Sequence, residues 1–230
     1  MCIRDRIGLE PRAAAEPASK SENYSWRDMF KALSSNKQAL RFFWYLLLLL
    51  TAILGQDILL EPYGAEAFGL SVQATTRITS IWGTFFLVSL SLGAALERKI
   101  SKLSQARFGA YIGILAFFLI VISGMGGILT LFYFGVILLG FATGLSTVSN
   151  LSLMLDMTTV GSVGLFIGAW GMASALARLS GNLLSGVLRE SFTPLLNSSV
   201  GGYNAVFIAE IIILIISLLI LRGVDVRLFQ

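Results

Sequence analysis

Blocks of mainly apolar residues alternate with short polar segments along most of this chain. A helix needs about 20 apolar residues to cross the ~30 Å hydrocarbon core of a bilayer, and the blocks are close to that length. Each block is therefore predicted to be a membrane-spanning helix. The predicted spans are residues 39–58, 76–96, 107–124, 127–149, 161–187 and 203–222.

These spans predict an all-α membrane protein with one six-helix transmembrane domain at residues 39–222. Residues 1–38 form a polar N-terminal tail, or the remnant of a central loop, before it, and residues 223–230 form a short tail after it. In the first tail apolar residues recur at helical spacing from Trp26 to Leu33, which predicts a short helix lying on the membrane surface. A disordered linker is the alternative for this segment.

The composition agrees with a membrane protein and excludes several soluble classes. Apolar residues make up 56% of the chain and charged residues 13%, against about 25% charged in a soluble domain. With one cysteine and no histidine, disulfide frameworks, Cys/His zinc sites and histidine acid–base chemistry are excluded. No nucleophile, phosphate loop or metal cluster is recognisable, so we expect neither an enzyme nor a metal site.

Positive residues predict the orientation in the membrane, because cytoplasmic segments carry an excess of lysine and arginine. The side opposite the termini has only Arg77 and Arg189 near span ends. The termini and the loop near residues 97–107 carry most of the positive charge, which predicts that both termini are cytoplasmic. The charges sit at span ends and form no basic stripe, so nucleic acid is not an expected partner. The residues that carry this bias are Lys20, Arg27, Lys31, Lys37, Arg41, Arg98, Lys99, Lys102, Arg107, Arg222 and Arg227.

Small residues four apart predict close contacts between the spans, because close backbone approach supplies much of the attraction between helices in lipid. Three glycine pairs have this spacing, and the fifth span continues with further small or polar residues near one face. We expect tight packing around the fifth span. The residues are Gly109 and Gly113, Gly140 and Gly144, Gly164 and Gly168, and then Gly171, Ala175, Asn182 and Ser185.

Two charged residues lie deep inside predicted spans. Arg178 and Glu210 fall at similar depths on two antiparallel spans, and an ionisable group in the membrane normally faces a partner or a cavity. We predict a salt bridge between Arg178 and Glu210, or a short network through Asn182. The pair would register the helices, or it would couple proton or substrate movement.

A second polar group lies near the end of the first span. Gln56, Asp57 and Glu61 are clustered there, with the two carboxylates at i and i+4, and Arg77 is a candidate counter-charge. Paired carboxylates can perform acid–base catalysis, but no nucleophile, histidine or metal-ligand set accompanies them. Catalysis is therefore not expected.

Several local sequences resemble the PucC family, also called the bacteriochlorophyll delivery family, of the major facilitator superfamily. The strings are QDILLEPYG from Gln56, FGLSV from Phe68, NLSLMLDMT from Asn150, GLFIGAWG from Gly164 and RGVDVRLF from Arg222. The resemblance implies one six-helix half of a twelve-span protein, with an N-terminal half missing from this chain and the substrate site between the halves.

The segment GAALER is similar to a cytoplasmic motif of that superfamily and supplies Gly93, Glu97 and Arg98 as candidate gating residues. Glu97 could accept hydrogen bonds from the start of the fifth span and hold the cytoplasmic side closed. Ile100 stands where the motif has a later glycine, which puts a full gating role in doubt.

The resemblance implies a role in light-harvesting complex assembly, or in handling chlorophyll-type pigment, in a photosynthetic membrane. Membrane lipid, light-harvesting polypeptides or pigment-synthesis enzymes are the implied partners, and pigment is a possible cargo whose magnesium would take an oxygen ligand. The alternatives are a proton-coupled small-molecule transporter and a membrane scaffold without a ligand. The candidate substrate- or pigment-binding residues are Gln56, Glu61, Asn150, Asp156 and Trp170.

Overall fold

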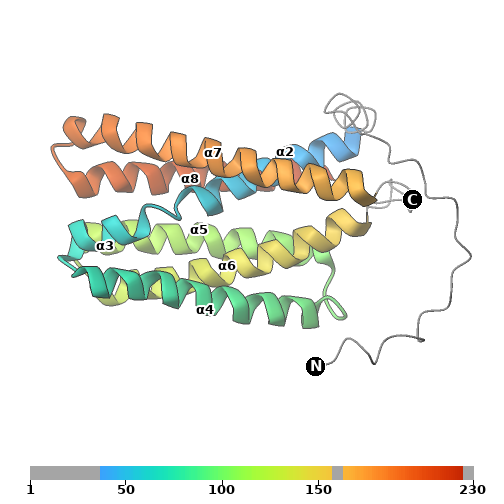
Figure 1. Ribbon diagram of the computed structural model, residues 1–230, viewed down its shortest axis with the longest axis horizontal. Helices are drawn as coiled ribbons and strands as arrows, with labels where there is room; N and C mark the ends of the chain where they lie inside the picture. Colours follow the sequence, from blue (N-terminus) through green and yellow to red (C-terminus); the bar gives the residue numbers. More distant parts are fainter. Residues whose placement is uncertain (1–36, 157–162, 225–230) are drawn as a thin grey trace, which may run out of the picture.

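The computed structural model describes residues 37–156 and 163–224, which form an elongated bundle of helices with no strand among them (Figure 1). The surface helix predicted near residues 25–33 lies outside the described residues. The helices are α2 (Lys37–Gly55), α3 (Leu60–Phe68), α4 (Val72–Leu96), α5 (Lys102–Gly126), α6 (Leu129–Asp156), α7 (Val163–Leu195) and α8 (Ser199–Leu221).

Five of these helices are long and apolar enough to cross a membrane: α2, α4, α5, α6 and α8. They coincide with five of the six predicted spans, which supports an all-α membrane protein. The remaining predicted span, 161–187, falls on α7, a helix of 33 residues. It is long enough to cross, but it is less apolar than the other five.

The first predicted span is interrupted, and this departs from the single helix expected at 39–58. Helix α2 ends at Gly55, and the chain makes a turn before the separate nine-residue helix α3 begins at Leu60. Pro62 explains the interruption, because a continuous helix would need a proline N–H to donate to the carbonyl of Ile58. In α3 this proline occupies the first turn, where helix N–H groups have no partner within the helix.

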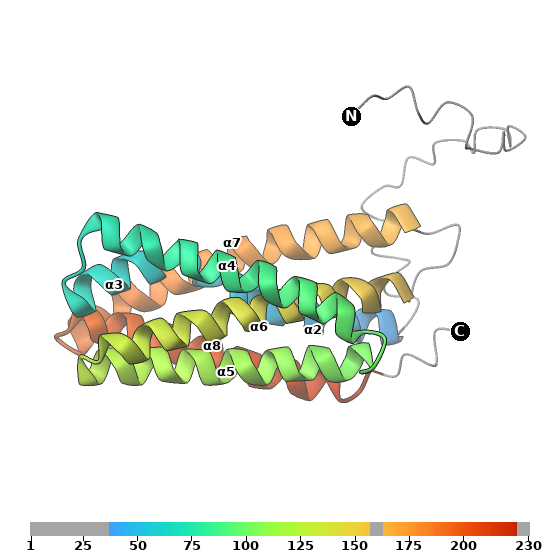
Figure 2. The ribbon, with the colours of Figure 1, turned by 90° about the horizontal axis from the view of Figure 1, so that it is seen from below.

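Helix α6 lies between α4 and α5, as Figure 2 shows. Its glycines permit this packing, as the glycine spacing predicted. A Cβ atom on Gly140 or Gly144 would collide with the backbone carbonyl of Trp82 or Phe86 on α4. On the other side, a Cβ on Gly109 of α5 would lie 2.5 Å from the Ser146 hydroxyl of α6.

Helix α2 packs against both α7 and α8, so the start of the chain's helical domain meets its end. The crossing of α2 and α7 is formed by two glycines. A Cβ on Gly181 would lie 2.7 Å from the Cα of Gly55, and the hydroxyl oxygens of Thr51 and Ser180 are 3.2 Å apart beside it.

The tight packing expected along the whole small-residue face of the fifth span is wrong for its first half. A Cβ on Gly164, Gly168 or Gly171 would meet no atom of the described residues within 4 Å. The small residues near the middle of α7 do pack within the chain, whereas those near its start leave an open face.

Candidate functional site

The break between α2 and α3 places an acidic side chain against the middle of α7. The Oδ2 atom of Asp57 lies 3.1 Å from a guanidinium nitrogen of Arg178. Non-helical backbone within a membrane domain is tolerated where protein covers it or where it lines a cavity. The Asp57 side chain is 28% exposed and that of Arg178 is 58% exposed, so the pair lies at the edge of the bundle.

The predicted salt bridge between Arg178 and Glu210 is therefore wrong. Helix α2 lies against both α7 and α8, so the residue at its broken end reaches Arg178 first. Asn182 does not link the two charges either, since its buried Oδ1 atom has no hydrogen-bond partner among the described residues.

Glu210 is the most unusual side chain of this region. It is 3% exposed, and neither carboxyl oxygen has a hydrogen-bond partner in the described part of the chain. Asp57 lies close enough to act on it electrostatically. A buried polar group without a hydrogen bond is costly, and ionisable groups inside membrane spans are commonly functional. Glu210, Asp57 and Arg178 together form what we call the break cluster.

Gln56 supports the break cluster from inside the bundle. Its side chain is fully buried, and its Nε2 atom donates to the Ile53 carbonyl at 3.3 Å and to Asp57 Oδ1 at 3.2 Å. The contact with Asp57 holds that carboxylate toward α7. The Ser185 hydroxyl donates to the carbonyl of Gly55 at 3.3 Å, which satisfies one of the acceptors exposed where α2 ends.

Glu61 takes a different partner from the one expected. Its carboxylate accepts a hydrogen bond from the Thr79 hydroxyl on α4. Arg77, the candidate counter-charge, forms no ion pair with Asp57 or Glu61 within the described residues. Helix α3 lies against α4 in antiparallel fashion and offers Thr79 to Glu61, whereas Asp57 faces α7.

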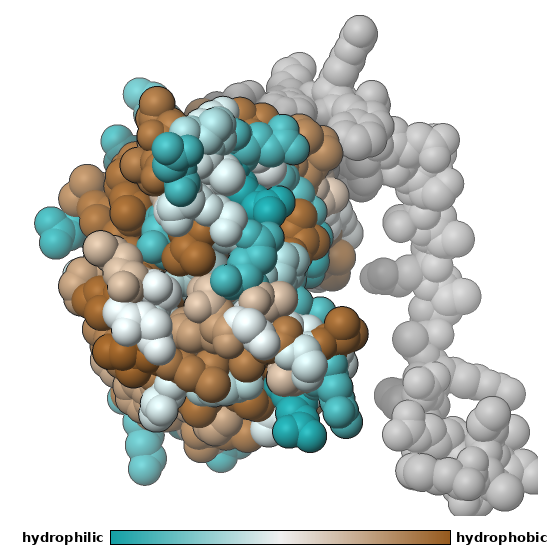
Figure 3. All heavy atoms as spheres, turned by 90° about the vertical axis from the view of Figure 1, so that its left-hand side faces the viewer, coloured by the Kyte–Doolittle hydropathy of each residue, from teal (hydrophilic) through white to brown (hydrophobic). Residues whose placement is uncertain are grey.

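A second polar group lies nearer the α7–α8 loop, and sequence reasoning missed it. Arg189 donates to Glu66 Oε1 at 2.9 Å, the Tyr203 hydroxyl donates to the same oxygen at 3.0 Å, and the Arg189 guanidinium lies 4.5 Å from the centre of the Tyr203 ring. Glu66 lies between the first two predicted spans, where no helix was predicted, so no helix face was available to suggest this contact. Figure 3 looks onto this end of the bundle, where hydrophilic and hydrophobic residues are mixed.

The candidates from the fourth and fifth spans lie apart from the break cluster. Asn150 is 1% exposed, donates to the Ser146 carbonyl at 2.7 Å and lies beside the Tyr45 hydroxyl. Asp156 ends α6 and pairs with Lys102 at 2.7 Å. Trp170 is half-buried and packs against the hydrophobic core. The five predicted binding residues therefore do not form one site.

The candidate gating residues lie at the end of α4. Gly93 is required for packing, because a Cβ there would lie 2.5 Å from the Val148 side chain on α6. Glu97 has one buried carboxyl oxygen without a partner, and Arg98 is exposed. The expected acceptor contact of Glu97 falls partly on residues 157–162, outside the described ranges.

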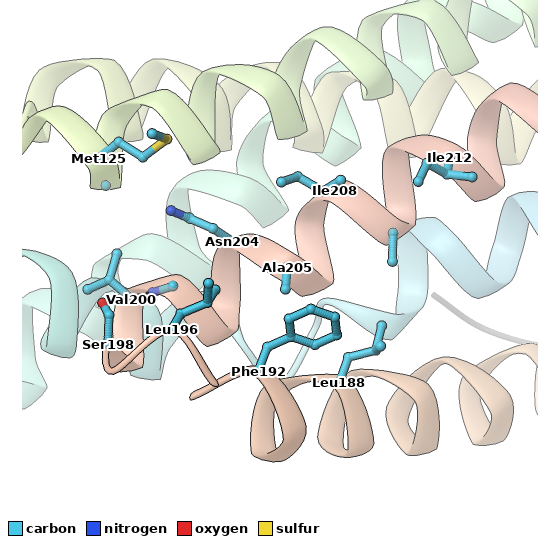
Figure 4. Close-up of a pocket in the computed structure, with 13 residues that line it drawn as sticks. Met125, Leu188, Phe192, Leu196, Ser198, Val200, Asn204, Ala205, Ile208 and Ile212 are labelled. Atoms are coloured by element: carbon cyan, nitrogen blue, oxygen red, sulfur yellow. Dashed lines mark hydrogen bonds between the residues drawn. The ribbon is translucent and has the colours of Figure 1, made fainter. Parts of the chain in front are cut away.

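A groove of about 860 Å³ opens between the ends of α5 and α7 and the first half of α8 (Figure 4). Its walls are mainly apolar, with Leu188, Phe192 and Ile208 among them. Asn204 contributes a polar side chain, whose Oδ1 lies 3.1 Å from the Tyr63 hydroxyl. No group of three histidine, cysteine or acidic side chains in residues 37–156 and 163–224 could hold a metal ion.

The family model and similar proteins named below point to the same protein family. The family model described as "PUCC protein" matches residues 7–229. Similar proteins include an uncharacterized protein of the puhA-bchM intergenic region of Rhodobacter capsulatus, 29% identical over 94% of this chain and 48% of its own length. Protein PucC of Rhodovulum sulfidophilum is 30% identical over 83% of this chain and 41% of its own. The bacteriochlorophyll synthase 44.5 kDa chain of Rhodobacter capsulatus is 28% identical over 81% and 45%. The chain spans less than half the length of these relatives.

Proposed function

This chain belongs to the PucC protein family, and we propose on that basis that the complete protein assists light-harvesting complex assembly or handles chlorophyll-type pigment in a photosynthetic membrane. The observation that carries the proposal is the family match over residues 7–229. One similar protein is named as a bacteriochlorophyll synthase chain, which supports pigment chemistry as the setting. The positive residues at the end that holds the α4–α5 loop support a cytoplasmic location for both termini.

We further propose that this bundle is one half of a major-facilitator-type protein. The open face of α7 supports this proposal. Gly164, Gly168 and Gly171 meet no packing atoms, and further along α7 the side chains of Leu179 and Leu183 are 59% and 61% exposed. A helix with small and apolar residues on an uncovered face suits close packing against other helices. A second six-helix half or a light-harvesting polypeptide would supply them.

Disruption of the gene in its host tests the assembly role. We expect the absorption bands of the antenna complexes to fall, and we expect the wild-type gene to restore them. A strain that carries Arg178→Gln still makes the protein, so it tests whether the break cluster itself is needed for assembly. Glu190→Gln, which changes an exposed residue near the end of the same helix, is the matched control. Antenna bands that stay unchanged in the disrupted strain would remove the proposal.

The break cluster favours one second candidate, a proton-coupled carrier for a small molecule. Glu210 is buried, has no hydrogen-bond partner among the described residues and feels the charge of Asp57, an arrangement that suits a carboxyl group which gains and loses a proton. Uptake into vesicles containing the full-length protein tests this candidate. Glu210→Gln is expected to abolish proton-driven uptake while the protein still inserts and folds, and equal uptake by this variant would exclude the role.

A further inference from the structure

The groove between α5, α7 and α8 is deep because α8 carries small residues along the face that lines it. Gly201, Ala205 and Ala209 are spaced four apart, so they lie on one side of the helix, and none has a side chain longer than a methyl group. Helices α5 and α7 both pack against α8 and lie on either side of these residues (Figure 4). The volume of about 860 Å³ is within the range of small-molecule sites in proteins.

The lining of this groove changes from polar to apolar along α8. Ser198 caps the start of the helix, where its hydroxyl accepts a hydrogen bond from the backbone N–H of Gly201 at 3.1 Å. Asn204 comes next, and Ile208 and Ile212, which are both about half exposed, continue the wall. Ile212 follows Asn204 by eight positions, which is about 12 Å along the helix axis. The groove therefore suits a ligand with a polar end and an apolar chain.

Asn204 has one end of its amide available to such a ligand. The residue is 9% exposed, and its Oδ1 atom lies 3.1 Å from the Tyr63 hydroxyl, which holds the amide in place. In the described part of the chain Nδ2 has no hydrogen-bond partner, yet it is not one of the unpaired nitrogens that the protein covers completely. Figure 4 shows this nitrogen pointing toward the open space beside Met125 of α5. Because an N–H group without an acceptor is costly in hydrocarbon, the site favours a ligand that brings a carbonyl to Nδ2.

The depth of Asn204 in the membrane indicates which ligand can supply this carbonyl. Asn204 follows Ser199, the first residue of α8, by five positions, or about 7.5 Å, and the span predicted from the sequence begins at residue 203. This level is the boundary between headgroups and hydrocarbon, where the ester carbonyls of glycerolipids lie. A further helix is about 10–12 Å across with its side chains and would have to reach the small residues between α5 and α7. A hydrocarbon chain is narrow enough to lie there.

We propose that this groove binds one acyl chain of a membrane glycerolipid, whose ester carbonyl accepts a hydrogen bond from Asn204 Nδ2. The acyl chain lies over Ala205 and Ala209 and runs toward Ile212. The headgroup lies beyond Ser198, outside the groove. No residue that lines the groove is charged, so a zwitterionic lipid is a sufficient probe. The inference concerns a lipid bound to this bundle and does not depend on the function proposed for the complete protein.

A pair of ester and ether lipids tests the hydrogen bond directly, because the ether lipid has the same chains and lacks the carbonyl. Native mass spectrometry of the detergent-purified chain measures the retention of dioleoyl phosphatidylcholine and of its dioleyl ether analogue. We expect the wild type to retain the ester lipid about two- to tenfold better, the range for one hydrogen bond, and Asn204→Leu to retain the two lipids equally. The ratio is measured within one protein, so it does not depend on how much of a variant is folded.

A second pair of variants tests the groove without changing Asn204. Ala205→Leu places a larger side chain on the floor of the groove, and Ala94→Leu makes the same change at an exposed position of α4. We expect Ala205→Leu to lower retention of the ester lipid at least as much as Asn204→Leu does, and Ala94→Leu to leave it unchanged. The proposal is overturned if the wild type retains no lipid or retains both lipids equally. It is also overturned if Asn204→Leu still prefers the ester lipid as the wild type does, or if Ala205→Leu retains as much lipid as Ala94→Leu.

Discussion

The crossing of α2 and α7 gives the sharpest test of the fold. Replacing Gly181 with alanine adds one methyl group that would lie 2.7 Å from the Cα of Gly55 and 2.8 Å from the Thr51 carbonyl oxygen. Nonbonded carbon atoms attract best at about 3.5–4.0 Å, so the two helices must separate by about 1 Å. Overpacking of this kind costs about 1–3 kcal/mol.

The matched control is Gly186→Ala on the same helix, where the added methyl group meets no atom within 4 Å. Alanine is favoured over glycine inside a helix by up to about 1 kcal/mol, so this control is expected to be neutral or slightly stabilising. After the same gain is allowed for Gly181→Ala, its net loss is up to about 2 kcal/mol. The separation would also stretch the 3.3 Å hydrogen bond from Ser185 to the Gly55 carbonyl.

Denaturant unfolding of the purified chain in detergent micelles, followed by circular dichroism, measures both variants. We expect the midpoint for Gly181→Ala to lie clearly below that of the wild type and that for Gly186→Ala to lie at or above it. If both variants unfold at the same denaturant concentration, α2 and α7 do not cross at these glycines. The placement of Asp57 beside Arg178 would then lose its structural basis.

Three further predictions concern single contacts, and each is read from the same unfolding measurement. Asp57→Asn and Arg178→Gln should each destabilise the fold by less than about 1 kcal/mol, because the pair is partly exposed, and the double variant should lose less than their sum; strict additivity would contradict the 3.1 Å pair. Tyr63→Phe should cost about 0.5–1.5 kcal/mol through its lost hydrogen bond to the Ile120 carbonyl, and an unchanged midpoint would argue against that bond. Lys102→Met should cost less than about 1 kcal/mol, because its pair with Asp156 is exposed, and a larger loss would show that this pair is buried in the full protein.

The spans could be predicted from the sequence because a helix that crosses the hydrocarbon core of a bilayer needs an apolar block of about 20 residues, and the blocks have about that length. The helix α3 could not be predicted in the same way. Gln56 and Asp57 were included in the predicted span at 39–58, and the nine residues of α3 are too few to give a spanning signal. Pro62 was the available signal, since a proline after a polar pair favours a restart of the helix over its continuation.

The partner of Arg178 could not be found from depth alone. Matching depths on α7 and α8 made Glu210 a reasonable partner, but depth does not tell which helix lies between two others. The structure places α2 against both helices, and this brings Asp57 to Arg178.

The packing of α2 against α7 and α8 sets an order on biosynthesis. Arg178 follows Asp57 by 121 residues, which at about 5–20 residues per second takes a ribosome roughly 6–24 s to produce. During that interval Asp57 sits in a nascent hydrophobic segment without its cation. Helix α2 is thus made well before the helices that complete its packing, and a chain released before α7 has been made would carry Asp57 without the cation that pairs with it.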